Sequence, residues 1–250
     1  MPIPLIKKIS PQHQQALEQA VAWIYKNSEP VGILVSGSII RGNPNPSSDL
    51  DFAILHDQPW RQRRQRWFNR IPTEMFFNTE PWLTYETLTN TFDGRAIMAH
   101  MLSTGIILHD TNGRLQSLQN RATTLLQNGP NLTAATLQRE RYSAASLVED
   151  AIDFGSSASL DAYQSRATAV VALVRYFFLQ HNQFLPRAKE RLQLLKAIDP
   201  TLAQLLGDAL MSTTTAEVAN TALQEAALRI LNEVGFFEWD SEQDLSAPPR

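Results

Sequence analysis

The sequence predicts an α+β protein, in which an N-terminal α/β half with a small mixed sheet precedes an all-helical bundle. Short apolar runs suited to buried strands lie within the first 110 residues, and helical periodicity dominates from about residue 133 onward. Between these regions, residues 128–136 (NGPNLTAAT) have the composition of a linker. We therefore expect one domain at residues 1–128 and a helical domain at residues 129–250.

Composition excludes several classes of protein. The chain has 250 residues, a formal charge of −3 and no cysteine, so disulfides, thiolate zinc sites and cysteine nucleophiles are excluded. The charge argues against a nucleic-acid backbone as the main partner. The N-terminus lacks the apolar stretch of a signal peptide, and no apolar run is long enough to span a bilayer. A cytoplasmic protein with no membrane partner is expected.

The elements of the first half follow from periodicity and turn residues. Residues 11–27 read as an amphipathic helix with Leu17, Ala20, Val21 and Ile24 on one face. Further along, we expect strands at 31–37, 49–56, 71–80 and 106–110, and helices at 61–70 (the basic stretch RQRRQRWFNR), 94–105 and 113–128. In the second half, helices are expected at 133–154, 160–180, 188–197, 200–211 and 216–234.

The segment DLDFAILH carries the strongest chemical signal. Its charged and apolar residues alternate, so Asp49 and Asp51 share one face of a strand while Leu50 and Phe52 point the other way. Two carboxylates on one face supply the hard oxygen ligands that Mg²⁺ prefers. An Asp-x-Asp alone is a weak signal, because charged pairs usually lie at solvated strand ends, but together with the features that flank it this pair predicts a magnesium-dependent phosphoryl or nucleotidyl transfer site.

Two flanking features complete this constellation. Gly37-Ser38 ends the preceding apolar strand, where the missing β-carbon lets backbone amides and a hydroxyl approach phosphate oxygens. Glu74, in the next strand, supplies a third carboxylate that would complete the metal site or accept a proton. Its alternative interpretation is an exposed strand carboxylate.

Residues 37–55 (GSIIRGNPNPSSDLDFAIL) resemble the signature of the DNA polymerase β-type nucleotidyltransferase superfamily: a Gly-Ser, a variable loop and an Asp-x-Asp flanked by apolar residues. The motif covers about residues 31–80. With its helical second half, the chain resembles the kanamycin and other aminoglycoside nucleotidyltransferases, which carry a C-terminal HEPN/KNTase-C-like helical domain. This part of the resemblance rests on layout and a few local matches.

The resemblance implies a nucleotidyltransferase that passes AMP from ATP to a hydroxyl. It assigns Mg²⁺ to Asp49, Asp51 and Glu74, and phosphate contact to Gly37 and Ser38. The acceptor would be a small molecule similar to an aminoglycoside, or the hydroxyl of a protein as in toxin-antitoxin enzymes. A homodimer is also expected from the resemblance.

Four further residues are candidates for the same reaction. Arg41, in Gly-Ser-x-x-Arg, would bind the triphosphate, and Ser48 would bond a phosphate or cap the turn. Glu149 is the alternative general base to Glu74, although it also fits the polar face of an amphipathic helix. Lys189, after Pro186, is a candidate for ATP phosphates.

Two other functions stay open. A non-catalytic nucleotide-binding module would keep the fold without the reaction, although such a module has no need of three carboxylates. Arg175 and His181 have the spacing of the HEPN ribonuclease motif, but Tyr176 stands where active members usually carry a polar residue, which favours a structural role.

Overall fold

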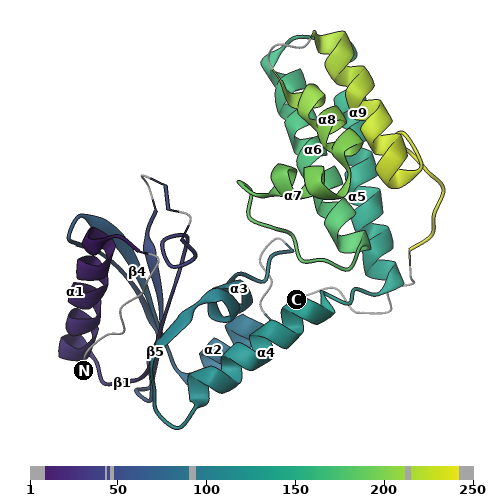
Figure 1. The fold of residues 1–250 in the computed structure, drawn as a ribbon. Helices are drawn as coiled ribbons and strands as arrows, with labels where there is room; N and C mark the ends of the chain where they lie inside the picture. The colour runs from purple at the N-terminus through teal and green to yellow at the C-terminus, as the bar shows by residue number, and fades with distance from the viewer. Residues whose placement is uncertain (1–8, 43, 46–47, 90–93, 212–214, 242–250) are drawn as a thin grey trace, which may run out of the picture. The chain divides into compact units, whose positions relative to one another are not determined.

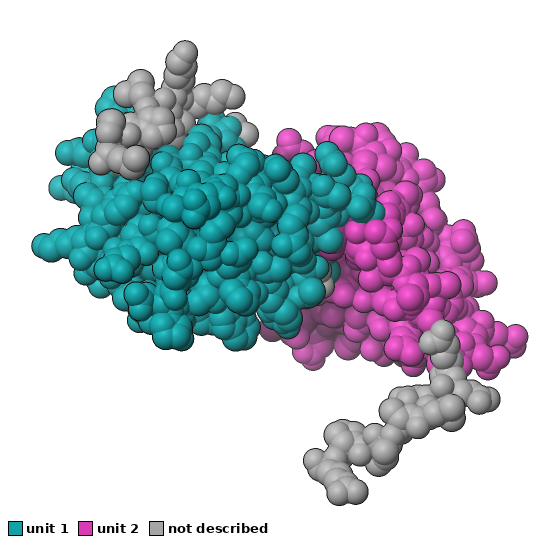
Figure 2. Space-filling model, turned by 90° about the horizontal axis from the view of Figure 1, so that it is seen from below, with its two compact units in different colours: residues 1–128 teal, residues 129–250 magenta. Residues whose placement is uncertain are grey.

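In the computed structural model, residues 9–42, 44–45, 48–89, 94–211 and 215–241 are described. The chain forms two compact units, residues 1–128 and residues 129–250, which Figure 2 colours separately. The first contains a mixed sheet with helices and the second is helical, so the expected α+β class is confirmed.

The described part of the first unit forms a five-stranded sheet in the order β3-β4-β2-β1-β5. Its strands are β1 (Pro30–Ser36), β2 (Leu50–His56), β3 (Gln62–Phe68), β4 (Ile71–Asn78) and β5 (Ile106–Asp110). The central strand β2 runs antiparallel to β1 and parallel to β4. The outer pairs, β1 with β5 and β3 with β4, are antiparallel.

Helix α1 (Pro11–Asn27) covers one face of this sheet (Figure 1). The side chain of Ser10 caps it by accepting a hydrogen bond from the amide of His13. Its apolar stripe packs on alternate residues of the strands, and Leu17, Phe52 and Phe77 are fully buried in that layer. The apolar residues that repeat every 3.6 positions in α1 and every second position in β2 therefore pack together in one core.

Three helices lie against the opposite face: α2 (Glu80–Leu88), α3 (Ile97–Thr104) and α4 (Arg114–Asn128). Close approach is possible because β1 carries Gly32 there, where a β-carbon would lie 2.6 Å from Cδ1 of Leu115. Helix α2 was not expected from the sequence. Thr79 at its N-cap and Pro81 in its first turn are the signals that mark its start.

The arginine-rich segment 61–70 was expected to be helical, and that prediction was wrong. It forms edge strand β3 and a hairpin with β4. Asn69 and Arg70 make the connection with φ angles of 44° and 63°, as a two-residue hairpin loop requires.

The reason for the error lies in how arginine behaves on a strand. Arg64 and Arg66, two residues apart on β3, both project toward α1. Their guanidinium carbons lie 5.4 and 4.7 Å from the ring centre of Trp23. Their stems cover aromatic surface while the charges stay in water. A strand built this way shows no apolar–polar alternation in its sequence.

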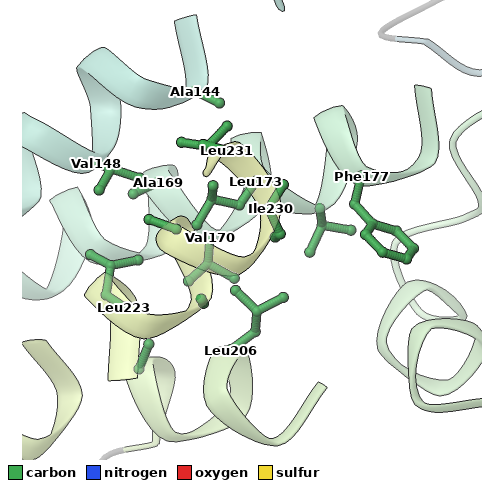
Figure 3. Packing of buried hydrophobic residues seen from close by; sticks show 14 of the residues in the cluster. Ala144, Val148, Ala169, Val170, Leu173, Phe177, Leu206, Leu223, Ile230 and Leu231 are labelled. Carbon is green, nitrogen blue, oxygen red and sulfur yellow. The ribbon is translucent and has the colours of Figure 1, made fainter. Parts of the chain in front are cut away.

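The second unit contains α5 (Ala134–Ile152), α6 (Leu160–Gln180), α7 (Arg191–Ile198), α8 (Pro200–Leu210) and α9 (Ala216–Leu231). Small residues at the contact between α5 and α6, such as Ala144 and Ala169, let the helices approach. Leu173, Leu223 and Leu231 fill the fully buried centre (Figure 3). Within the described ranges, no helix is long and apolar enough to cross a membrane.

Candidate active site

Four polar residues form a row across one face of the sheet. Ser36 on β1 pairs with Asp51 on β2, and Asp51 pairs with Glu74 on β4. Glu74 in turn pairs with Gln65 on β3. Directly paired residues project to the same side of a sheet. Here that side faces away from α1, because the residues next to the row in sequence, Val35, Leu50 and Met75, pack under the helix. The strand pairing therefore aligns two candidate carboxylates.

The loop between β1 and β2 begins at Gly37, which lies against this row. Gly37 has a φ of 108°, a conformation that L-residues rarely adopt. A β-carbon there would lie 3.0 Å from the carbonyl oxygen of Asp49 and 3.3 Å from Oδ2 of Asp51. Both the backbone angle and the close approach therefore favour glycine at this position.

The same loop is tied together by two serines. The Oγ atoms of Ser38 and Ser48 lie 2.7 Å apart, and both side chains are buried. Ser48 Oγ also accepts a hydrogen bond from the amide of Asn45 at 2.8 Å. The backbone amide of Arg41 donates to the carbonyl of Gly37, and the Arg41 side chain is exposed. The bond between Ser38 and Ser48 thus joins the two ends of the loop next to Asp49. Phosphate contact by Ser38, Ser48 and Arg41 stays a prediction.

Glu74 is held by neighbours on β3. Nη2 of Arg63 donates to Oε1 and Oε2 of Glu74 at 2.7 and 2.6 Å, and Nε2 of Gln65 also donates to Oε1. The Glu74 side chain is 21% exposed and that of Arg63 57%. Glu74 is therefore not an isolated strand carboxylate in solvent, because its charge is compensated on the face that carries Asp51.

The residues fit a divalent cation in chemistry and backbone position. Asp49, Asp51 and Glu74 offer hard carboxylate oxygens, and the missing β-carbon of Gly37 leaves room beside Asp51. Among the residues that the structure describes, however, no three acidic or histidine side chains are gathered closely enough to hold a metal. The ion pair with Arg63 orients the carboxylate of Glu74, one of the three candidate metal ligands, toward β3.

Two members of the row, Ser36 and Gln65, and the ion-pair partner of Glu74, Arg63, were not predicted as site residues from the sequence. Ser36 Oγ lies 3.3 Å from Oγ1 of Thr104 on α3, which links the row to the covering helices. The position of Ser36 directly before Gly37 was an available signal. Arg63 and Gln65 had no such signal, since their placement depends on the pairing of β3 with β4.

Glu149, the alternative base, lies exposed on α5 of the second unit. It lines a pocket of about 610 Å³ together with Tyr142, Trp239, Glu238 and Asp240. The rings of Tyr142 and Trp239 have centroids 5.2 Å apart. The pocket joins aromatic walls to carboxylates, and the role of Glu149 as a base stays a prediction.

The remaining helical candidates lie apart from that pocket. Lys189 is exposed in a turn before α7, so the helix begins two residues later than this lysine rather than at it. Arg175 is paired with Glu140 through two hydrogen bonds of 2.7 and 2.8 Å. His181 caps α6, with Nδ1 2.7 Å from the carbonyl oxygen of Phe177.

Comparison with known proteins agrees with this geometry. Residues 15–75 match the family described as nucleotidyltransferase domain, a range that includes Gly37, Ser38, Asp49 and Asp51. A nucleotidyltransferase-like protein from Exiguobacterium sibiricum 255-15 has a similar fold, with a TM-score of 0.51 and 18% identity. The match covers 88% of this chain and 74% of that protein. No curated protein matches the chain.

The family match and the row of carboxylates lie on the same strands. The matched residues run from α1 through β4, so they contain the sheet face that carries Asp51 and Glu74. The resemblance expected from the sequence is thereby confirmed at the level of the superfamily. Residues 15–75 of the first unit therefore carry a nucleotidyltransferase domain of the DNA polymerase β-type superfamily.

Proposed function

We propose that the chain transfers AMP from ATP to a hydroxyl of a small, aminoglycoside-like molecule in a magnesium-dependent reaction. One observation carries this proposal: the aligned Asp51 and Glu74, with Asp49 and the Gly37 turn beside them, lie within the nucleotidyltransferase match. Binding of a magnesium nucleotide needs only one or two carboxylates besides the phosphates, so a third candidate ligand favours catalysis over binding alone.

In this reaction the acceptor oxygen forms a bond to the α-phosphorus of ATP. The bond from that phosphorus to the bridging oxygen breaks, and pyrophosphate leaves with the electron pair. Asp49, Asp51 and Glu74 would hold Mg²⁺, which when bound neutralises the charge on the phosphates. Most of the rate enhancement would come from positioning and charge neutralisation.

The chain's own residues have separate tasks. Ser38, Ser48 and Arg41 would bind and orient the phosphates from the loop that Gly37 begins. The hydroxyl proton would pass to a carboxylate, either Glu74 in the sheet or Glu149 on α5. Lys189 is a further candidate for the phosphates, from the turn before α7.

The pocket on the helical unit supports an amine-bearing acceptor. Glu149, Glu238 and Asp240 line it with aromatic rings. Carboxylates and aromatic faces both attract ammonium groups. An aminoglycoside carries several such groups, so its charge complements this lining.

The proposal is tested by following two labels from Mg-ATP with a panel of aminoglycosides. Nucleotidyl transfer moves the α-³²P label to the acceptor and releases the γ-³²P label as pyrophosphate. Phosphoryl transfer would instead move the γ-label to the acceptor, which would contradict the proposal. Asp49→Asn, which removes one ligand charge while keeping its shape, is expected to stop transfer of the α-label.

The same experiment separates the alternatives. Transfer of the α-label to protein, with no aminoglycoside labelled, would replace the small acceptor by a protein hydroxyl. Tight ATP binding without release of either label would favour a nucleotide-binding module and contradict catalysis.

A further inference from the structure

The side chain of Arg63 is placed so that it and a divalent cation compete for the same carboxylate. Its Nη2 contacts both oxygens of Glu74, at 2.7 and 2.6 Å. A metal at Glu74 needs one or both of these oxygens. A positive charge this close to both of them also repels a cation.

Arg63 is held in this position by the strand pairing. It pairs with Phe76 on β4, and its guanidinium carbon lies 5.1 Å from the centre of that ring. Gln65, two residues further along β3 and on the same face, lies directly opposite Glu74 and donates to Oε1. In this structure the Glu74 carboxylate is therefore oriented toward β3.

The backbone of Glu74, in contrast, belongs to the central row. It pairs with Asp51, the residue that lies against Gly37. In the described residues the three candidate ligands are not gathered into a metal group. For Glu74 to share a cation with Asp51, its side chain would have to turn away from Arg63, which requires no change in strand pairing.

We propose that Arg63 is a positioning residue that sets the affinity of the site for its divalent cation by competing for Glu74. Cation binding and the Arg63–Glu74 ion pair oppose one another, so each weakens the other. The inference rests on the proposed role of Glu74 as a metal ligand, and does not depend on the identity of the acceptor.

Two substitutions on the same strand test this competition. Arg63→Met removes the charge but keeps a flexible apolar stem over Phe76. Arg66→Met is the matched control, because it removes the same charge from the opposite face of β3, where the guanidinium lies over Trp23. Both variants change the net charge of the chain equally.

The measurement is the affinity of the full chain for Mn²⁺ alone. Binding is monitored as the loss of the electron paramagnetic resonance signal of free Mn²⁺. Arg63→Met is expected to bind about three- to tenfold more tightly, the range for a nearby but partly solvated charge. Arg66→Met is expected to change the affinity by less than about twofold, because its charge is more distant and screened. Unchanged or weaker binding by Arg63→Met would overturn the inference.

A double-variant cycle shows whether Arg63 acts through Glu74. In a Glu74→Gln background, the gain from Arg63→Met should largely disappear. If the full gain remains, Arg63 acts as a general positive charge and the competition is wrong. Failure of the unaltered chain to bind Mn²⁺ saturably, or saturable binding with no gain in Arg63→Met, would overturn this inference. The proposed function fails separately, if no α-label is transferred from Mg-ATP.

Discussion

Gly37 gives the sharpest single test of how the loop supports the carboxylates. In Gly37→Ala the new β-carbon would lie 3.0 Å from the carbonyl oxygen of Asp49 and 3.3 Å from Oδ2 of Asp51. Both distances are tighter than ordinary van der Waals contact, so the loop or the Asp51 side chain must move by a few tenths of an ångström. The backbone must also keep a φ of 108° or rearrange.

The size of the effect follows from these two causes. A non-glycine residue at such a φ costs about 1–3 kcal/mol of folding free energy. A displacement of a few tenths of an ångström is expected to lower turnover by roughly threefold to tenfold, since a misplacement of about 1 Å can cost a hundredfold. Turnover should therefore fall much more than the fraction of folded protein does.

The assay compares pyrophosphate release and urea unfolding in Gly37→Ala and Gly113→Ala. Gly113 has a φ of 69° but nothing within 4 Å of its would-be β-carbon, so alanine there tests the backbone cost without the contact. We expect both variants to lose stability and only Gly37→Ala to lose turnover. Wild-type turnover in a folded Gly37→Ala variant would refute the steric argument, as would an equal loss in Gly113→Ala.

Three further predictions concern stability. Burial lowers the pKa of His56 despite the neighbouring Asp57 carboxylate, so the unfolded chain binds the proton more readily. Stability is then lost as pH falls below about 6.5, and His56→Gln should remove that loss in melts between pH 5 and 8. The ion pair with Arg229 lowers the pKa of Asp199, so its contribution is present above about pH 4 and lost as pH falls through the lowered pKa. Asp199→Asn should flatten acid unfolding there, and an unchanged curve would contradict this. Ser48→Ala removes the buried bond to Ser38 and should cost roughly 1–2 kcal/mol in urea unfolding, whereas a change below about 0.3 kcal/mol would show that the loop does not depend on it.

The parts of the fold that periodicity encodes were predictable from the sequence. Helix α1 was expected at the residues where it occurs, because its apolar spacing and the proline at its start are local signals. The alternation in β2 correctly placed Leu50 and Phe52 on the face opposite Asp51, and in the structure that apolar face packs under α1. These predictions required only the spacing of apolar residues along the sequence.

Features that depend on long-range pairing were not predictable in the same way. The arginines of β3 carry no strand pattern, because their burial partners are aromatic rings on α1 and β4. The ion pair between Arg63 and Glu74 exists only in the register that the hairpin sets. The alignment of Glu74 with Asp51 likewise required the parallel pairing of β2 with β4, which the sequence alone does not state.

The central claim is that the carboxylate row performs nucleotidyl transfer, and one comparison tests it most directly. Pyrophosphate release from Mg-ATP, in the presence of the aminoglycoside panel as acceptors, would be measured for the unaltered chain, Asp51→Asn and Asp57→Asn, with folding checked by circular dichroism. Asp57 is the matched control, since it follows β2 and its exposed side chain pairs with Arg114. The account predicts that release falls to background in Asp51→Asn and persists in Asp57→Asn. Release at the wild-type rate from a folded Asp51→Asn variant would contradict it.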